Sequence, residues 1–549
     1  MKSRRLMYVT AMTLFAALAI PLGLTAQDDA AQHKKAPHHH YKLIDIGTFG
    51  GPASYFTNGF DGILNNQGTA AGWTDTSMPD PYPPFCFNGD CYESHAFQSQ
   101  NGIVTDLGVL SGGASSNAVW ITANGTIVGT SQNGQIDPLF PGFPETRAVI
   151  WREGAITDLG MLPEGGYESG GFSANNNGEV VGLAFNTVPD PFSLGAPGFY
   201  PTQTRAFLWQ KGTMQDLGTL GGNDAAAFFV NDRGQITGQS YTNTTPNQTT
   251  GLPTADPFFW ENNTMLDIGS LGGTLGSPSA LNNKGHVVGV SNMAGDLTSH
   301  PFLWSKKTGL QDLGTLGGNN GVTNWINDNG DIAGKADLPG PAPQNHDAVL
   351  WRRNGAQMID LGVLPGDSCA NAYYVNSRGQ VVGTSENSDL CRIPTGEHAF
   401  LWENGGPMVD LNSLIPPSSS LQLVFAFAIN DEGEIVGVGV PLGCTPDSTN
   451  PCSHAFVLIP CSNDQPSIEG CDYSMVDTST VATRVSPGVE KPGSANPNQI
   501  APAFDNLANP MLRRFAPQFR PWNRGIGAER RALKPTGATP AGMTNANSH

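Results

Sequence analysis

Apolar residues between positions 41 and 460 fall into short runs that are separated by polar, glycine-containing turns. Four kinds of run follow one another in a constant order, for example Ala280–Leu281, Val287–Val288, Ala399–Trp402 and Met408–Leu411. Because each run is short and is bounded by Asn, Asp or Gly, each is predicted to be a β-strand. Few segments show a helical period, and Gly and Pro are abundant, so the chain is expected to be all-β.

The fourth run leads into a glycine-rich link, Asp216–Gly222 (DLGTLGG), which recurs eight times with small changes. Successive copies are 45 to 61 residues apart, and each begins with an aspartate. A four-strand unit of this length has the size of one propeller blade. The eight aspartates are Asp45, Asp106, Asp158, Asp216, Asp267, Asp312, Asp360 and Asp410.

Two kinds of tight turn join the strands within a unit. The first and second strands are joined by turns such as Asn176–Gly178 and Asp232–Gly234, in which Asn tolerates and Gly prefers a positive φ. A glycine such as Gly212 marks a second tight turn, between the third and fourth strands. Each unit is therefore predicted to be a four-stranded antiparallel meander.

The strands are apolar on both faces, which is the pattern of a sheet that is covered on both sides. In a propeller each blade is covered by its two neighbours. A tryptophan ends the third strand in six units, and we expect it to pack between blades. These residues are Trp151, Trp209, Trp260, Trp304, Trp351 and Trp402.

The last unit has its first three strands, ending near Leu458, but no fourth strand. The repeats begin at Tyr41–Asp45 with a fourth strand and nothing before it. We expect this N-terminal strand to complete the last blade, since closure removes exposed sheet edges. The sequence thus predicts an all-β, eight-bladed β-propeller at residues 41–460.

The phrase His-Ala-Phe-Leu-Trp at His398–Trp402, with the glycine-rich link that follows such phrases, resembles the HAF-repeat family of bacterial extracellular proteins. The resemblance covers about residues 41–460. It implies secretion and a repeat architecture, and it implies no activity and no catalytic residue. Arg147, Arg205, Asp256 and Asp347 stand at the first position of the phrase in four units, in place of histidine.

The eight aspartates could form a ring that binds a metal or a cationic ligand, or each could have a structural role in its own blade. The His or Arg of the phrase lies diagonally across the hairpin from the aspartate and can reach it. We favour this structural contact, because a residue that is repeated in all eight units suggests a requirement of the fold. The residues of a single active site would differ from unit to unit. Asp256 and Asp347 stand where His or Arg stands in other units, and a carboxylate cannot form an ion pair with the repeated aspartate. We therefore expect the two blades that contain them to hold their aspartates differently.

Signatures of enzymes and of bound ions are weak. Asn327–Asp331 resembles a calcium loop but lacks the later Glu, and it occupies the position of the other turns. No nucleophile elbow, zinc-protease motif or phosphate loop is present in the sequence. We therefore assign no catalytic residue, no metal and no cofactor.

The loops between the second and third strands vary most, and the first three are long and carry aromatic residues stiffened by neighbouring prolines. They should lie at the same end of the blades as the glycine-rich links. Rigid, exposed aromatic rings there could bind a glycan or a surface protein, or they could pack on one another. The residues are Tyr82, Phe85, Phe87, Phe140, Phe143, Phe192 and Tyr200.

The two ends of the chain differ from the repeats. Residues 1–26 have a basic start and a short apolar run and read as a secretory signal, so no transmembrane segment is expected in the mature chain. Residues 27–40, with His38–His40, read as a polar linker. Residues 461–480 read as a disulfide-pinned exit, and 481–549 as a disordered, basic Pro/Asn-rich tail.

The eight cysteines form four close pairs, which in a secreted chain indicates disulfides better than zinc ligands. The pairs are Cys86 with Cys91, Cys369 with Cys391, Cys444 with Cys452, and Cys461 with Cys471. The net charge is −19, with the acidic residues concentrated in the repeats. That charge would repel nucleic acid phosphates.

These features favour a secreted, monomeric propeller that binds an extracellular glycan or surface protein through the long loops of blades 1–3. The alternative is a secreted polysaccharide hydrolase or lyase with a central acidic site. Propellers host both functions, so the fold does not decide between them. An enzyme would be favoured by a funnel lined with non-repeated His, Asp, Arg or Tyr.

Overall fold

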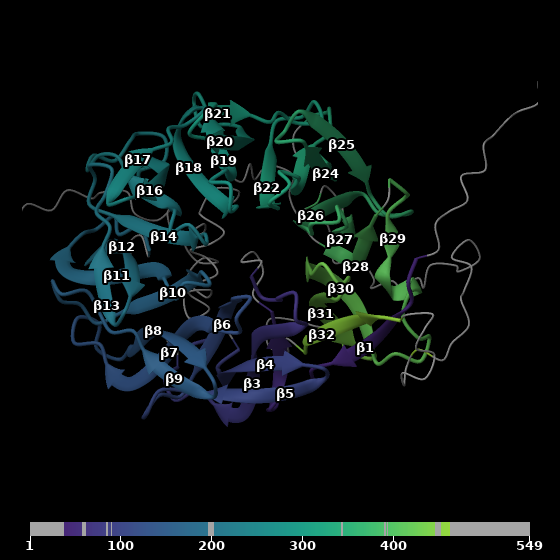
Figure 1. The fold of residues 1–549 in the computed structure, drawn as a ribbon, viewed down its shortest axis with the longest axis horizontal. Coiled ribbons are helices and arrows are strands. Elements are labelled where there is room, and N and C mark those ends of the chain that lie inside the picture. Colours follow the sequence, from purple (N-terminus) through teal and green to yellow (C-terminus); the bar gives the residue numbers. More distant parts are fainter. Residues whose placement is uncertain are drawn as a thin grey trace, which may run out of the picture. The chain divides into compact units, whose positions relative to one another are not determined.

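A computed structural model describes residues 38–56, 62–83, 86–88, 90–195, 202–341, 344–388, 391, 394–403, 405–444, 452–461 and 471 (Figure 1). The predicted signal segment at 1–26, residues 27–37 of the predicted linker and the predicted tail at 481–549 lie outside the described residues. Of the predicted exit segment at 461–480, only Cys461 and Cys471 are described. Among the described residues, no helical segment has the length and apolar character to span a bilayer.

The strands form four-stranded antiparallel units that follow one another around a central axis in chain order (Figure 1). The first four units are β2 (Gly50–Tyr55), β3 (Thr69–Pro79), β4 (Tyr92–Gln100) and β5 (Ile103–Gly108); β6 (Ser116–Ile121), β7 (Ile127–Ile136), β8 (Pro144–Arg152) and β9 (Ala155–Asp158); β10 (Ser169–Ala174), β11 (Val180–Pro189), β12 (Thr202–Gln210) and β13 (Thr213–Asp216); and β14 (Ala225–Val230), β15 (Ile236–Tyr241), β16 (Ala255–Glu261) and β17 (Thr264–Asp267).

The second half of the chain repeats the pattern. Its units are β18 (Gly272–Leu281), β19 (Val287–Met293), β20 (Ser299–Ser305) and β21 (Gly309–Asp312); β22 (Gly321–Ile326), β23 (Ile332–Asp337), β24 (His346–Arg352) and β25 (Gln357–Gly362); β26 (Cys369–Val375), β27 (Val381–Ser388), β28 (Pro394–Trp402) and β29 (Val409–Asp410), followed by the 3-10 turn η2 (Leu411–Ser413); and β30 (Leu421–Ile429), β31 (Ile435–Pro441), β32 (His454–Pro460) and β1 (Tyr41–Asp45). The fold is the predicted β-propeller, and we number its blades 1 to 8 in this order.

The N-terminal strand is the outer strand of blade 8. Strand β1 pairs with β32 in antiparallel register, from Tyr41 opposite Pro460 to Asp45 opposite Phe456. The predicted pairing of Tyr41–Asp45 with the last strand of the repeats is therefore confirmed. It covers the outer edge of β32 and places residues from the two ends of the repeat region in one sheet.

Blades pack face to face through the residues that the sequence pattern marked as apolar on both sides. Five of the six tryptophans that end the third strands are buried: Trp151, Trp260, Trp304, Trp351 and Trp402. Trp304 of blade 5, for example, lies 4.9 Å from the Phe259 ring of blade 4, measured between ring centroids. The predicted packing of these residues between blades is present there.

The glycine of the second strand leaves room for the phenylalanine of the repeated phrase. In blade 5, a Cβ at Gly289 would lie 2.7 Å from the Phe302 ring and would overlap the carbonyl oxygen of Ser277. The same Gly and Phe recur at Gly182 and Phe207 of blade 3. The phenylalanine thus fills the space above a bare backbone, which explains why these two residues recur together.

In seven of the eight blades, a buried asparagine at the turn between the first and second strands ties the blade to a neighbouring one. In blade 4, Asn231 Nδ2 donates to the carbonyl oxygen of Asn282 at 2.9 Å, and Asn282 Nδ2 donates onward to the Asn327 carbonyl at 3.0 Å. Seven such bonds are found among the described residues. Their donors are Asn65, Asn175, Asn231, Asn282, Asn327, Asn376 and Asn430.

We call these bonds the carboxamide ring. The bond from Asn430 to the Asn65 carbonyl, at 3.1 Å, joins blade 8 to blade 1. Blade 2 departs from the pattern, because Thr122 stands at the ring position and carries no amide. There Asn124 Nδ2 donates to the Asn176 carbonyl at 3.2 Å instead.

The same asparagines also build their own turns. Asn231 Oδ1 accepts the backbone N–H groups of Arg233 and Gln235, each at 3.0 Å, and Nδ2 donates to Gln235 Oε1 at 2.8 Å. All four hydrogen-bonding positions of the amide are thereby used. The expectation that Asn serves these turns by adopting a positive φ is wrong, because only the glycine does so, at φ 70° for Gly234.

Each repeated aspartate closes a short turn at the end of its blade. Its Oδ1 accepts the backbone N–H of the residue two positions on, for example Gly218 to Asp216 at 2.8 Å. That glycine has a φ of +85°, which the turn requires. The equivalent bond is present at all eight aspartates: Asp45, Asp106, Asp158, Asp216, Asp267, Asp312, Asp360 and Asp410.

The predicted partner from the repeated phrase reaches this aspartate in several blades. His95 and His300 donate from Nδ1 to Asp106 and Asp312, each at 2.9 Å, and Arg205 Nε donates to Asp216 at 2.7 Å. His454 does the same to Asp45 at 2.9 Å, which links the two ends of the repeat region.

Four blades depart from this contact. Arg147 Nε is 3.9 Å from Asp158, and the guanidinium donates instead to Glu145 and to the Tyr167 carbonyl. His398 bonds to Asp367 at 3.1 Å rather than to Asp410. In the remaining two blades Asp256 and Asp347 face a second aspartate. Burial and the neighbouring carboxylate raise the pKa of both to about 6, and Asp347 shares a hydrogen bond with Asp360.

All four predicted cysteine pairs are disulfide-bonded: Cys86–Cys91, Cys369–Cys391, Cys444–Cys452 and Cys461–Cys471. The end of the predicted linker belongs to the fold. His38 Nδ1 lies 2.9 Å from Glu403 Oε1, and the Cys461 N–H donates to the His40 carbonyl at 2.7 Å. These contacts follow from the pairing of β1 with β32. The pairing brings His38 against Glu403 of blade 7 and His40 against Cys461, the residue that follows β32.

Replacing Asp216 by Ala should lower the free energy of unfolding by about 2 kcal/mol, because the change removes the turn bond and the partly buried ion pair with Arg205. Urea unfolding of the variant measures this. Asp267→Ala is the matched control, since Asp267 makes the same turn bond but faces Asp256 rather than a cation. Its loss should be smaller, about 1 kcal/mol or less. Equal losses in the two variants would contradict the role of the ion pair.

The pair Asp347 and Asp360 should make stability depend on pH. The pKa of Asp347 is about 6 in the folded state against 3.8 in the unfolded chain, so its contribution is complete below pH 4 and is lost as the pH rises through 6. Asp347→Asn should therefore melt at a higher temperature than the unmodified protein at pH 7.5, and the difference should vanish near pH 4. Melting curves across this range measure it. Asp312→Asn, which loses a histidine partner, should show no such gain, and a gain for Asp347→Asn that is the same at every pH would reject the account.

Candidate functional site

A cavity of about 280 Å³ lies at the centre of the propeller. It is lined by the last residues of the inner strands and by the turns that join the first and second strands. These are the turns of the carboxamide ring, and they stand at the opposite end of each blade from the long loops between the second and third strands. The cavity therefore opens away from the loops that the sequence singled out.

Four aromatic rings line the cavity where other blades carry small or aliphatic residues. They are Trp120 on β6, Phe229 on β14, Trp325 on β22 and Tyr374 on β26. Each lies two residues before the ring position of its blade. The equivalent residues of the other blades are Ile63, Ser173, Ala280 and Ala428. The cavity is thus a place where the eightfold repeat of the sequence is broken.

The aromatic rings form two groups. Trp120 and Phe229 meet edge to face with their ring centroids 6.2 Å apart, although they belong to blades 2 and 4. Trp325 and Tyr374 stack at 4.9 Å with an angle of 20° between the ring planes. Phe229 is buried, whereas the other three rings are half-buried and keep surface toward the cavity.

The rim of the cavity is polar and carries three carboxylates, Asp232, Asp328 and Asp431. Each accepts hydrogen bonds from a neighbouring turn. Asp328, for example, accepts the backbone N–H of Asn283 at 2.8 Å and its Nδ2 at 3.1 Å. These bonds hold the carboxylates in place and leave lone pairs for a further donor. Asn327–Asp331, with its faint likeness to a calcium loop, is one of these turns.

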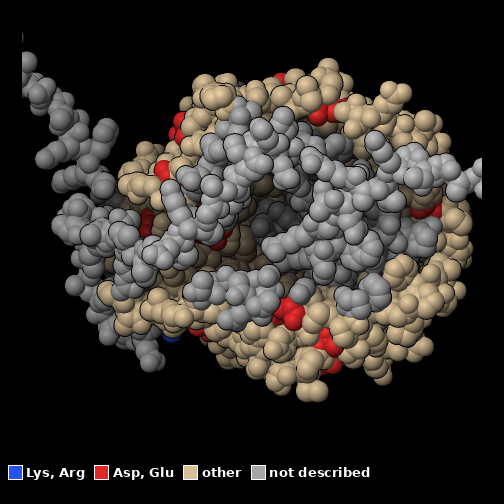
Figure 2. Space-filling view, turned by 180° about the vertical axis from the view of Figure 1, so that it is seen from behind, with Lys and Arg blue, Asp and Glu red and all other residues tan. Residues whose placement is uncertain are grey.

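This arrangement can bind a small ligand that has both an apolar face and hydroxyl or amino groups. The rings offer flat apolar surface, and the rim offers carboxylate and amide groups. Among the described residues, the only three His, Cys, Asp or Glu side chains close enough together to hold a metal lie elsewhere. Asp and Glu side chains are also spread over the visible described surface, with little Lys or Arg between them (Figure 2).

The eight repeated aspartates do not line the cavity. Each lies at the end of an outer strand, in the turn of its own blade. The alternative of a central carboxylate ring built from them is therefore wrong, because the fourth strand of a blade is farthest from the axis (Figure 1).

The long-loop aromatic residues have mixed environments. Phe87 and Phe143 are 2% and 1% exposed, so their rings pack inside the protein and offer no surface to a ligand. Tyr82, Phe140 and Phe192 are half-buried. Phe140 meets Phe143 edge to face at 5.7 Å, and Phe192 packs against the hydrophobic core. Phe85 and Tyr200 lie outside the described residues. For Phe87 and Phe143 the expected ligand surface is corrected to internal packing.

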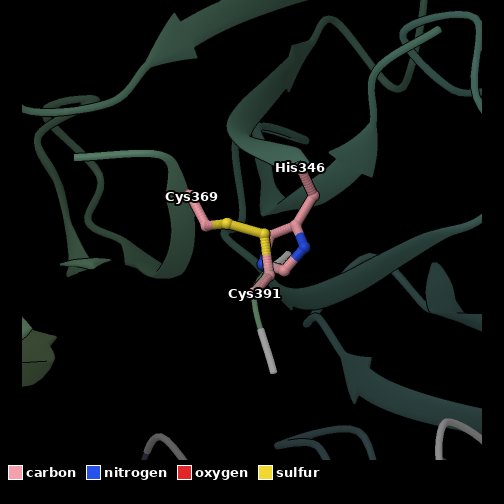
Figure 3. A group of neighbouring side chains, drawn as sticks. All are labelled: His346, Cys369 and Cys391. Carbon is pink, nitrogen blue, oxygen red and sulfur yellow. A yellow bond between two sulfur atoms is a disulfide. The ribbon is translucent and has the colours of Figure 1, made fainter. Parts of the chain in front are cut away.

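A second group of chemical interest lies between blades 6 and 7. His346 on β24 is buried against the disulfide Cys369–Cys391 (Figure 3), and its Nε2 is 3.4 Å from Nζ of the half-buried Lys335. Burial and the Lys335 charge lower the pKa of His346 to about 2, so the imidazole is neutral. Burial likewise lowers the pKa of Lys335.

Two carboxylates of blade 7 extend this group. Glu386 and Glu397 stand opposite each other on β27 and β28. Burial, and then the charge of Glu386, raise the pKa of Glu397 to about 7. Nearby, the hydrogen bond with Asp367 raises the pKa of His398. Perturbed groups of this kind are typical of functional sites and also of structural ion networks.

Sequence reasoning missed the aromatic cavity and the His346 group. A signal for the first was present: Trp120 and Trp325 are tryptophans outside the repeated phrase, at a strand position that is small or aliphatic in four other units. No local signal marked the second, because His346 and Cys369 come from different repeats and meet only in the fold.

Comparisons with known proteins show the fold alone. No protein-family model and no curated protein matches the chain. The acylaminoacyl peptidase of Pyrococcus horikoshii is 11% identical with a TM-score of 0.38, and the match covers 71% of this chain and 58% of that one. An oligogalacturonate lyase in complex with manganese is 8% identical, with a TM-score of 0.39 and coverage of 78% and 96%.

The β-propeller domain of the Trilobed protease from Pyrococcus furiosus is also similar, at 8% identity and a TM-score of 0.37, over 68% of this chain and 95% of that domain. This chain spans less than two thirds of the P. horikoshii peptidase. Because the TM-scores are below 0.5, the function must be argued from this chain's own residues.

Proposed function

We propose that the protein is a secreted binding propeller whose central cavity takes a neutral sugar residue of an extracellular glycan. The observation that carries this proposal is the grouping of Trp120, Phe229, Trp325 and Tyr374, which break the repeat at one place in the fold. Residues that only stabilise blades recur in most of them, whereas these four aromatic rings do not. Their placement around one cavity favours a role in binding at the centre of the propeller over a role in stabilising single blades.

A sugar residue matches the chemistry of the cavity. Its C–H face can lie on an aromatic ring, and its hydroxyl groups can donate to the rim carboxylates Asp232, Asp328 and Asp431. A cavity of about 280 Å³ is small for a binding pocket and suits one terminal residue rather than a long chain. The acidic rim and the net charge of −19 disfavour uronic acids and other anionic sugars.

The proposed location outside the cell rests on the signal-like segment at 1–26, the four disulfides and the resemblance to the HAF-repeat family. Disulfides persist in oxidising compartments, which agrees with secretion. We propose a monomer with no nucleic acid partner.

A hydrolase or lyase is the rival function. One observation favours it, and it concerns residues that lie outside the cavity. Glu397, with its pKa of about 7, could act as a general acid or base beside Glu386. Turnover of a polysaccharide that is abolished by Glu397→Gln would establish this rival. Turnover in the unmodified protein is the first thing to measure on any sugar that binds.

A glycan array followed by calorimetry on the mature chain tests the binding proposal. A neutral sugar should bind, and Trp325→Ala should weaken its affinity about tenfold or more, because loss of a ring at the centre of a contact costs on the order of 1.4 kcal/mol or more. Phe140→Ala in the long loop is the control and should leave the affinity unchanged. Melting curves establish that both variants fold.

The two variants also separate the two candidate surfaces. Loss of binding in Phe140→Ala but not in Trp325→Ala would move the site to the long loops of blades 1–3. Absence of binding to every neutral sugar would overturn the proposal for the cavity.

A further inference from the structure

Three side chains of the kinds that can ligate a metal meet at the junction of blades 6 and 7 (Figure 3). His346 comes from β24 of blade 6, Cys369 from the start of β26, and Cys391 from the loop between β27 and β28 of blade 7. Their ligand atoms all lie within 4.8 Å of one another. Cys369 is 0% and His346 8% exposed, and the two cysteines are joined as a disulfide.

We propose that reduction of the Cys369–Cys391 disulfide turns this group into a Cys2His site for Zn²⁺. The reductant is a dithiol or a phosphine. It supplies two electrons, the S–S bond breaks, and each sulfur takes up one proton. A dithiol gives up its own two protons and becomes a disulfide, whereas a phosphine takes its oxygen from one water molecule, which also supplies the two protons, and becomes a phosphine oxide. Binding of Zn²⁺ then displaces the two thiol protons, and a water molecule completes the fourth position.

The geometry requires only small movements. In tetrahedral zinc sites the metal lies about 2.3 Å from sulfur and about 2.0 Å from nitrogen, so two ligand atoms are roughly 3.5 to 3.8 Å apart. The ligand atoms here are already within 4.8 Å. Once the S–S bond is broken, rotation of the two cysteine side chains separates the sulfurs to the distance that the metal needs.

The charges around the site are compatible with zinc. Zn²⁺ with two thiolates and a neutral imidazole carries no net charge, so it adds no repulsion toward Lys335, which lies 3.4 Å from His346. Thiolate and imidazole ligands are also the set that selects zinc over calcium or magnesium. Cys369 and His346 are buried and Cys391 is half-buried, which limits exchange with water.

The site would connect parts of the fold that the disulfide leaves separate. Both cysteines belong to blade 7, so the disulfide links only that blade's inner strand to its own loop. His346 belongs to blade 6. A metal held by all three residues therefore ties two neighbouring blades together, and it would preserve this junction under reducing conditions.

The other three disulfides are internal controls. Among the described residues, no further group of three His, Cys, Asp or Glu side chains has its ligand atoms this close together. Cys86–Cys91 is the best comparison, since both cysteines lie within one loop of blade 1. Its reduction would supply two thiols without a third ligand.

The test is a titration with Co²⁺, used as a coloured substitute for Zn²⁺, on the mature protein reduced with a phosphine. One equivalent of Co²⁺ should give the absorption of a tetrahedral thiolate complex, and Zn²⁺ should abolish it. X-ray absorption of the zinc form should then show two sulfur ligands and one nitrogen ligand. The disulfide-bonded protein should give no signal.

Variants establish which residues bind. Cys391→Ser and His346→Ala should each weaken metal binding about a hundredfold or more, whereas the double change Cys86→Ser with Cys91→Ser should leave it intact. Melting curves establish that each variant folds, and Cys391→Ser in its loop remains informative if His346→Ala does not fold. No stoichiometric Co²⁺ complex in the reduced protein, or a complex lost only in the Cys86 and Cys91 variant, would overturn the proposal.

Discussion

The propeller depends on one hydrogen bond that is made again and again: a buried asparagine amide donates to the backbone carbonyl of the next blade. Each four-stranded sheet has apolar faces but could slide or rotate against its neighbours, because apolar packing has little directionality. The carboxamide ring fixes the relative position of the inner strands. It does so where the turns are tight, and it uses all four hydrogen-bonding positions of an amide such as Asn231. Asp, Ser or Thr lacks the two N–H groups that this arrangement needs.

The other repeated features lie on the outer strands and help to hold the blades in the same closed order. The aspartate turn ends each blade and directs the chain through glycines to the next inner strand. The bond from His454 to Asp45 and the pairing of β1 with β32 bring the two ends of the repeat region together. Because blade 8 contains the first and the last strands, loss of the N-terminal strand would expose an edge and weaken the junction with blade 1. Inside this frame the aromatic residues of the cavity are free to differ from blade to blade.

Local, repeated signals in the sequence predicted most of the fold. Short apolar runs, turn residues and the count of strands gave the four-stranded units, the pairing of Tyr41–Asp45 with the last strand, and the disulfide pairs. The contact between the phrase and the aspartate followed from antiparallel register in four blades and does not form as predicted in the other four. The role of Asn231 and its equivalents did not follow from the sequence, since a local pattern shows that Asn suits a turn but not that its amide reaches another blade. Predicting the cavity would have required knowing which inner-strand residues converge at the axis. Predicting the His346 group would have required knowing which residues of different repeats are in contact. His38 was missed because its partner, Glu403, is far away in the sequence.

The most direct test of this account is the unfolding free energy of Asn231→Asp and Asn376→Asp, measured with urea. Each change keeps the oxygen that accepts the two turn N–H groups but places a carboxylate oxygen against the carbonyl of the next blade. The account predicts that each variant loses about 2 to 4 kcal/mol, with similar losses in blades 4 and 7 because both break the same ring. Unfolding free energies equal to that of the unmodified protein in both variants would contradict it.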